Sequence, residues 1–323
     1  IGPEPNGWTQ FIKIYFKNTI GYYFKNVLED IKMTDIKNSQ KVGLVLEGGA
    51  NRGIFTSGVL DCLKKNEIYL PYVISVSVGT CNAIDYISRQ IGRTKDCMIP
   101  HGRNTPPICW KNILKKKSPI NLDMVFDEYP NKLIPFDYTT FWNSDIVSEF
   151  VVTNCLTGSA EYFSPPQNRD KKRLMQICRA SCSMPYILPE VYIDNIPYLD
   201  GGCSDPIPFK RAIKMGYQKN IVIMTRTLEY IPKKKATWLK KIERVMYSKY
   251  PNFVKLLSQA DEQYQKILEE IKVFENQKKL LVIRPTQELA KRMEQNQNHM
   301  EAFYKHGYDV TNYRLNEIRD FIQ

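Results

Sequence analysis

Short apolar runs of strand length, each ending in a turn, define much of the chain after residue 41. Residues 42–46 and 72–76 are two such runs, and each is followed by a small-residue turn and then by apolar residues at helical spacing. A strand, a loop, a helix, a second strand and a tight turn into a helix are typical of an α/β sheet with parallel strands. Further strands are predicted on both sides of a Thr157-Gly158 turn, in a hairpin with Asp194-Asn195 at its tip, and at 220–226 and 280–285.

Residues 1–40 have a different pattern, that of an amphipathic helical extension. Its apolar stripe consists of Ile12, Phe16, Ile20, Tyr23, Phe24, Val27 and Ile31. Such a helix packs on the main domain or lies in a membrane interface. In a third interpretation the segment precedes the true start, because Met33 would itself serve as an N-terminus.

A second amphipathic helix is predicted between Pro232 and Leu257. Its apolar stripe consists of Trp238, Leu239, Ile242, Val245 and Met246, with Lys240, Lys241 and Arg244 beside it. One hypothesis is that this face, with Lys233 to Lys235, docks on anionic lipid. The alternative is a solvated basic helix whose stripe packs on the core.

The formal charge of +12 indicates an anionic partner, which is nucleic acid, a phospholipid surface or an acidic substrate. No zinc-finger, RNP or helix-turn-helix pattern accompanies the charge, so nucleic acid is the least favoured of the three.

The eight cysteines form no C-x-x-C pair, which favours reduced thiols and a cytoplasmic location. The three histidines form no ligand-spaced cluster and no calcium-loop motif is found, so we expect neither a metal nor a cofactor. We expect no signal peptide and no transmembrane helix, because the longest uncharged run, 68–84, contains Pro71 and Gly79 in a strand-turn-helix pattern.

The turn after the first strand is rich in glycine and opens a helix. Backbone N–H groups at such a helix start point toward a negative charge, either a phosphate or an oxyanion. The turn lacks the lysine of a P-loop and the spacing of a dinucleotide site. It consists of Gly48, Gly49, Ala50, Asn51, Arg52 and Gly53.

The turn after the second strand resembles a nucleophile elbow, G-x-S-x-G, in which a cramped backbone exposes the serine. Here the stretch is Ser75-Val76-Ser77-Val78-Gly79, so Ser75 replaces the first glycine. Either Ser77 is a nucleophile in an altered elbow, or these are ordinary serines at the end of a buried strand.

Asp200 lies directly before Gly201 and Gly202, at the end of a strand-like run. A carboxylate held on a glycine turn is suited to act as general base for a serine hydroxyl. The alternative is a turn aspartate that caps its own backbone.

Together these motifs resemble the patatin-like phospholipase family. Gly48-Gly49 through Arg52-Gly53 resembles the family's G-G-x-[RK]-G oxyanion loop, Ser77 its elbow serine, and Asp200 its D-G-[GA] aspartate. The stretch CRASCSMPYILPEV, residues 178–191, also resembles the family's R-A-S-x-x-x-P segment. The resemblance extends from about residue 41 to 226, and the remainder is similar to the C-terminal part of a bacterial branch of the family.

This resemblance implies a three-layer α/β/α fold with a mainly parallel sheet and a helical C-terminal region. It also implies a Ser77–Asp200 dyad that hydrolyses acyl esters of lipids without histidine or calcium. The two C-terminal histidines, His299 and His306, lie in a charged region that does not suit a catalytic triad. We expect Arg52 to anchor the loop rather than touch the substrate.

We therefore predict a helical extension at 1–40, a catalytic domain at 41–226 and a basic, mainly helical region at 227–323 whose strand at 280–285 returns to the core. The predicted function is a serine lipid acyl hydrolase in the cytoplasm, with association to the inner face of the membrane left open. The alternative is a catalytically weak relative that binds acyl lipids or membranes without efficient turnover. The sequence does not determine the head group, the acyl chain or the oligomeric state.

Overall fold

The computed structural model of this protein describes residues 42–99, 107–109, 118–232 and 236–323. The predicted helical extension at 1–40 and the basic run Lys233 to Lys235 lie outside the described residues.

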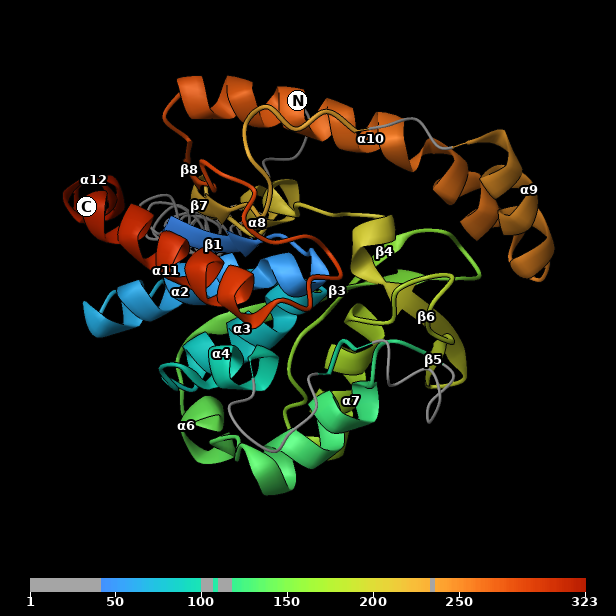
Figure 1. Cartoon of the computed structure of the whole chain (residues 1–323), viewed down its shortest axis with the longest axis horizontal. Coiled ribbons are helices and arrows are strands. Elements are labelled where there is room, and N and C mark those ends of the chain that lie inside the picture. Colours follow the sequence, from blue (N-terminus) through green and yellow to red (C-terminus); the bar gives the residue numbers. More distant parts are fainter. Residues whose placement is uncertain (1–41, 100–106, 110–117, 233–235) are drawn as a thin grey trace, which may run out of the picture.

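An eight-stranded sheet forms the centre of the molecule, in the order β5-β6-β3-β2-β1-β7-β8, with β4 paired to β3 (Figure 1). The strands from β3 to β8 along this order run parallel, whereas β4, β5 and β6 make antiparallel pairs. The mainly parallel sheet predicted from the sequence is therefore confirmed. The strands are β1 (Val42–Leu46), β2 (Tyr72–Val76), β3 (Val147–Asn154), β4 (Ala160–Phe163), β5 (Val191–Ile193), β6 (Ile196–Asp200), β7 (Lys219–Ile223) and β8 (Leu280–Ile283).

Helices cover both faces of this sheet, as the burial of β1 illustrates. All five residues of β1 are buried, with Leu44 and Leu46 facing one core cluster and Val45 the other. Strands buried on both faces are continuously apolar, which is the pattern of 42–46 in the sequence. The first cluster is covered by α2, α3, α7 and α11 and the second by α8 and α10, so the three-layer α/β/α fold is confirmed.

The helices are α2 (Gly53–Lys65), α3 (Val78–Ile87), α4 (Arg93–Met98), α6 (Tyr138–Trp142), α7 (Lys171–Ser181), α8 (Phe209–Lys214), α9 (Thr237–Met246), α10 (Pro251–Asn276), α11 (Gln297–Tyr313) and α12 (Leu315–Ile322). Two short 3₁₀ turns, η1 (Ala50–Arg52) and η3 (Gly201–Cys203), and a π-helix, η2 (Met124–Leu133), complete the elements that the structure describes.

The C-terminal region joins the same core through a strand and a helix. β8 pairs in parallel with β7, and α11 crosses α2 at two glycines. A Cβ on Gly58 would lie 2.0 Å from the carbonyl oxygen of Tyr304, and one on Gly307 would lie 2.2 Å from that of Phe55. Only glycine allows two helix backbones to approach this closely. The domain boundaries at 40 and 226 stay predictions.

Candidate active site

Ser77 occupies a strained turn between β2 and α3. Its backbone has φ 56° and ψ −128°, a combination that is rare for a residue with a side chain and that clusters at functional sites. A Cβ on Gly79 would lie 2.9 Å from the carbonyl oxygen of Leu46, so this glycine lets the start of α3 pack against β1. Strand β2, the tight turn and α3 therefore have the geometry of a nucleophile elbow.

Ser75, which replaces the usual glycine, does not face the cavities around Ser77. Its side chain is fully buried, and its Oγ lies 3.3 Å from Thr80 Oγ1 as a hydrogen-bond donor. Ser77 is half-buried and lines the cavities described below. The two serines therefore lie in different environments, although they are only two residues apart.

Asp200 accepts a hydrogen bond from the hydroxyl of Ser77, with 2.6 Å between Asp200 Oδ2 and Ser77 Oγ. Its other oxygen accepts from the backbone N–H of Gly202 at 2.8 Å. Burial raises the pKa of Asp200 from 3.8 to about 6, while the bonds from Ser77 and Gly202 and the charge of Arg292 act in the opposite direction. The carboxylate is thus held against the hydroxyl with its pKa near neutrality, which suits a group that must accept and return a proton.

The turn around Asp200 is crowded, most of all at Gly201. A Cβ on Gly201 would lie 2.2 Å from the carbonyl oxygen of Val151, and one on Gly202 would lie 3.0 Å from Asp200 Oδ1. The backbone N–H of Asp200 is held by the carbonyl oxygen of Ser183 at 2.8 Å. The glycines therefore let the end of β6 pack on β3 and bring the carboxylate to Ser77.

The glycine-rich loop lies directly beside Ser77, because a Cβ on Gly48 would be 2.9 Å from Ser77 Cβ. Three of its backbone N–H groups already donate hydrogen bonds to carbonyl oxygens. Asn51 N–H donates to that of Arg292, Arg52 N–H to that of Gly49, and Gly53 N–H to those of Ala50 and Asn51. Among the described residues, the N–H groups of Gly48, Gly49 and Ala50 have no acceptor.

A short segment of the C-terminal region, Lys291 to Glu294, which we call the strap, is hydrogen-bonded to the glycine-rich loop. Asn51 donates through its backbone N–H to the carbonyl oxygen of Arg292 at 3.1 Å and through its side-chain Nδ2 to that of Glu294 at 2.6 Å. Sequence reasoning missed this contact, since nothing in the strap's residue types signals a partner 243 positions away.

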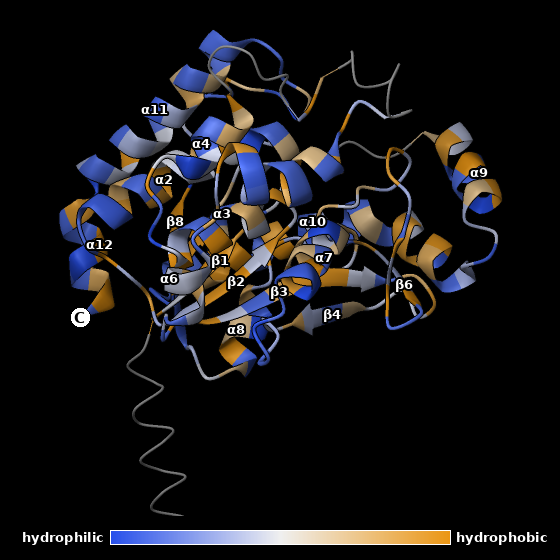
Figure 2. Ribbon diagram, turned by 90° about the horizontal axis from the view of Figure 1, so that it is seen from below, coloured by the Kyte–Doolittle hydropathy of each residue, from blue (hydrophilic) through white to orange (hydrophobic). Residues whose placement is uncertain are grey.

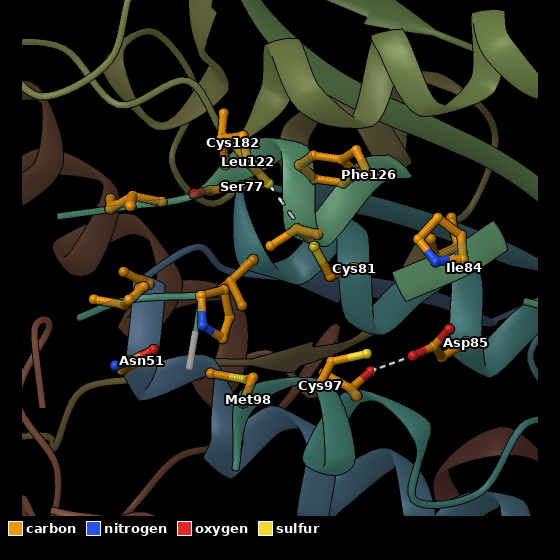
Figure 3. Close-up of a pocket in the computed structure, with 18 of the residues that line it drawn as sticks. Asn51, Ser77, Cys81, Ile84, Asp85, Cys97, Met98, Leu122, Phe126 and Cys182 are labelled. Carbon is orange, nitrogen blue, oxygen red and sulfur yellow. Dashed lines mark hydrogen bonds between the residues drawn. The ribbon is translucent and has the colours of Figure 1, made fainter. Parts of the chain in front are cut away.

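Two cavities meet at Ser77. The first, of about 100 Å³, is apolar and extends between α3, α4, η2 and α7 to the buried pair of Arg93 and Asp85, whose charged atoms are 2.8 Å apart. Figure 3 shows Ser77 and Asn51 on one side of this cavity and Asp85 on the other. Its lining includes Cys81, Ile84, Met98, Leu122, Phe126 and Cys182.

The second cavity, of about 340 Å³, has a mixed lining of apolar side chains and three arginines, Arg52, Arg226 and Arg292, and we call it the polar cavity because of these charges. Burial and the charges of Arg226 and Arg292 lower the pKa of Arg52 to about 10, and within the described chain its Nε has no hydrogen-bond partner. The carboxylate of Glu47 does not form an ion pair with the Arg52 guanidinium. It accepts hydrogen bonds from the backbone N–H of Thr225 at 2.6 Å and from the hydroxyl of Tyr264 at 2.5 Å instead.

The other two arginines also lack a carboxylate within ion-pair distance in the part of the chain that the structure describes. Arg226 instead stacks on Tyr230, with its guanidinium carbon 3.5 Å from the ring centroid. Arg292 lies close enough to Asp200 to affect its pKa. The arrangement is suited to binding an anionic group of a ligand near Ser77.

No cluster of three or more histidine, cysteine, aspartate or glutamate side chains with metal-binding geometry exists among the described residues. His306 Nε2 lies 3.1 Å from the backbone nitrogen of Thr286, and His299 faces Glu294 at 3.5 Å. Neither histidine lines the two cavities at Ser77.

Comparison with known proteins gives the family. The family model described as "Patatin-like phospholipase" matches residues 44–213, and a model described as "Domain of unknown function (DUF6363)" matches residues 250–323. The chain belongs to the patatin-like phospholipase family. The resemblance seen in the sequence is thus confirmed, and family membership is consistent with lipid ester hydrolysis.

Relatives of this patatin-like chain include proteins named as lysophospholipases. The uncharacterized protein YjjU of Escherichia coli K12 is 28% identical over 211 residues, 63% of this chain and 57% of that protein. Lysophospholipase NTE1 of Candida albicans is 23% identical over 220 residues, 66% of this chain. The crystal structure of VipD from Legionella pneumophila aligns with a TM-score of 0.47 at 15% identity, over 86% of this chain and 67% of that one.

The patatin-like chain spans little more than half of the E. coli relative and 15% of the yeast lysophospholipase. In the described ranges, every helix is too short or too polar to cross a bilayer.

Proposed function

We propose that this protein is a serine hydrolase of acyl-ester lipids, with Ser77 as the nucleophile and Asp200 as the general base. The observation that supports this proposal most directly is the 2.6 Å hydrogen bond from Ser77 Oγ to Asp200 Oδ2 on a strained strand-to-helix turn. A hydroxyl aimed at a buried carboxylate in this way is an activated nucleophile.

In the proposed reaction, Ser77 Oγ attacks the ester carbonyl carbon as its proton passes to Asp200. The N–H groups of Gly48, Gly49 and Ala50 stabilise the oxyanion, because they lie beside Ser77 and are not engaged elsewhere in the described structure. The tetrahedral intermediate expels the alcohol, which takes the proton from Asp200 and leaves an acyl-enzyme. Water then attacks the acyl carbonyl carbon as its proton passes to Asp200. The second tetrahedral intermediate breaks its bond to Ser77 Oγ, Asp200 returns the proton to that oxygen, and the fatty acid leaves.

The two cavities suggest how the substrate lies. The apolar cavity suits the acyl chain, and the polar cavity suits a phosphate in the head group, because Arg226 and Arg292 line it. Arg52 lines the same cavity, so in this proposal it also faces the phosphate, unlike the sequence-based expectation that it only anchors the loop. We infer that the substrate is a phosphate-bearing acyl ester, and the lysophospholipase named among the relatives supports this class. The residues proposed for catalysis require neither a metal nor a cofactor.

The site of action follows from the same chemistry. A lipid substrate and a formal charge of +12 favour a peripheral protein at an anionic membrane surface, which we place on the cytoplasmic side. Nucleic acid is not a proposed partner.

The decisive experiment compares wild type with Ser77→Ala, Asp200→Asn and the double variant on lysophosphatidylglycerol. Each single variant should lose at least about a thousandfold in kcat/KM, and the double variant should lose no more, because the two groups act as a unit. Fluorophosphonate should label wild type and not Ser77→Ala. A folded wild type that is neither labelled nor active would support the alternative of a lipid-binding relative without turnover.

The head-group assignment has its own test with a matched substrate. Arg226→Gln and Arg292→Gln should lower kcat/KM for lysophosphatidylglycerol by about tenfold each, because each removes a charged hydrogen bond to phosphate. At a pH well above the pKa of Asp200, where losing the charge of Arg292 does not protonate the carboxylate, hydrolysis of monoacylglycerol with the same acyl chain should be unchanged. Equal losses on both substrates would show that the arginines act on the loop or on Asp200 instead.

A further inference from the structure

Helix α9 presents its apolar side to solvent. Trp238 is 64% exposed and Val245 78% exposed, and Ile242 and Met246 on the same stripe are also exposed. Large apolar side chains gathered on one exposed helix face usually mark an interaction surface. Figures 1 and 2 place α9 at the edge of the molecule, away from the central sheet.

Glu243 is the one buried residue of α9, and its contacts fix which side of the helix faces the protein. Glu243 is 1% exposed and accepts a hydrogen bond from the hydroxyl of Tyr186. In the turn after α9, the hydroxyl of Tyr247 accepts from the backbone N–H of Tyr186 at 2.7 Å. A buried carboxylate is costly unless it is hydrogen-bonded, so a rotation that buried Trp238 and exposed Glu243 would break a specific contact.

Helix α9 lies next to the polar cavity, because Tyr186, which contacts Glu243 and Tyr247, also lines that cavity. Leu228 and Ile231, which precede α9, are exposed by 55% and 75%, while their neighbours Tyr230 and Pro232 line the cavity. We call the exposed stripe of α9 the docking face; it consists of Trp238, Ile242, Val245 and Met246. The segment from Leu228 to Pro232 therefore lines the cavity with two of its residues and exposes two apolar side chains to solvent.

The charges around the docking face are mostly positive. Lys240, Lys241 and Arg244 are exposed on α9, and the exposed acidic residue of this segment is Glu229. Apolar side chains flanked by basic ones are typical of helices that lie in the interface of an anionic bilayer. A second copy of the chain fits less well, because a symmetric contact would bring these three cations together.

We propose that the docking face inserts into the surface of an anionic phospholipid bilayer, with the mouth of the polar cavity beside it. The inserted side chains are apolar, and the lysines and the arginine contact lipid phosphates. Lipid binding itself does not require the proposed chemistry at Ser77, so the two can be tested apart. The inference extends the proposed function by naming the surface on which the substrate is reached.

Flotation with vesicles tests the proposal on the full chain carrying Ser77→Ala, so that the lipid stays intact. The vesicles are phosphatidylcholine alone or phosphatidylcholine with phosphatidylglycerol. Val245→Glu should lower the partition coefficient at least about tenfold, because it places a charge in the inserted face. Its matched control is Val273→Glu on α10, which is also exposed, at 52%, and should bind as the parent does.

The charge contribution is tested by Lys240→Ala and Lys241→Ala, each of which should lower the preference for anionic vesicles about fivefold. Equal binding to both vesicle types, no binding by the parent, or unchanged binding by Val245→Glu would overturn the proposal. So would sedimentation showing a dimer that Val245→Glu converts to a monomer.

A soluble short-chain ester separates this proposal from the proposed function. In the background with Ser77 intact, Val245→Glu should hydrolyse the soluble ester as wild type does and lose vesicle hydrolysis about tenfold. Absence of ester hydrolysis in wild type would refute the proposed function and leave the flotation result to decide the docking face.

Discussion

Replacing Asp200 with asparagine should abolish hydrolysis and, at neutral pH, make the fold more stable. Asp200 is 5% exposed, and burial raises its pKa from 3.8 to about 6. At pH 7 the folded protein therefore holds an ionised carboxylate in an environment that disfavours it relative to the unfolded chain. At about 1.4 kcal/mol per pKa unit, this difference costs about 3 kcal/mol.

Asparagine at this position removes the charge and can keep both contacts. Its oxygen can accept from the Gly202 N–H as Asp200 Oδ1 does at 2.8 Å, and its amide can donate to Ser77 Oγ. The free energy of unfolding of Asp200→Asn should therefore exceed that of wild type by up to about 3 kcal/mol at pH 7.5. For a chain of this size, we expect a rise in Tm of roughly 5 °C.

The sign of the pH dependence makes the test specific. Because the pKa of Asp200 is higher in the folded state, the penalty is present above pH 6 and disappears as the pH falls below the unfolded value. Urea unfolding of both proteins at pH 7.5 and near pH 4 measures the difference, and other titrating groups such as Asp205 cancel in the comparison. A variant that is inactive but no more stable, or equally stabilised at both pH values, would refute the assignment of the raised pKa to burial.

Four further predictions follow from the site and the fold. Hydrolysis by wild type should fall as the pH drops through about 6, because protonated Asp200 cannot accept the serine proton, and a pH profile of kcat/KM measures this limb in the free enzyme. Ser75→Ala should leave fluorophosphonate labelling intact, since Ser75 is fully buried and Ser77 lines the cavities, and the reverse pattern would reject the elbow assignment. Hydrolysis should survive strong chelation, and a calcium requirement in a purified assay would contradict the dyad. Gly307→Ala should lower the free energy of unfolding by about 2 kcal/mol or more in a urea titration, because its Cβ would lie 2.2 Å from the Phe55 carbonyl oxygen, and an unchanged midpoint would rule out the close helix crossing.

The sheet and the elbow were predictable because local chemistry determines them. β1 and β2 have the predicted bounds, since strands buried on both faces must be continuously apolar and must end where glycine or serine turns the chain. The hairpin tip at Asp194 and Asn195 has positive φ at both residues, as a tight turn requires. The catalytic roles of Ser77 and Asp200 stay predictions that the hydrogen bond between them supports.

Other features depend on contacts that sequence periodicity cannot specify. The period of α9 identifies an apolar stripe but does not say whether that stripe or Glu243 faces the protein, because the partner Tyr186 lies 57 positions earlier. The convergence of Arg52, Arg226 and Arg292 likewise follows from the arrangement of three separate segments around one cavity. Such long-range pairings leave no local pattern in the chain.

The contact between Asn51 and the strap, Lys291 to Glu294, restricts the length of the strap rather than its residue types. Asn51 contacts two carbonyl oxygens of the strap and no side chain of it in these bonds. As far as this contact is concerned, the residue types in the strap can therefore change. The number of residues between β8 and α11 cannot change without moving the two carbonyl oxygens. A one-residue deletion there would shift both acceptors away from Asn51 and slacken the loop beside Ser77, although every residue of the patatin-like domain would be unchanged.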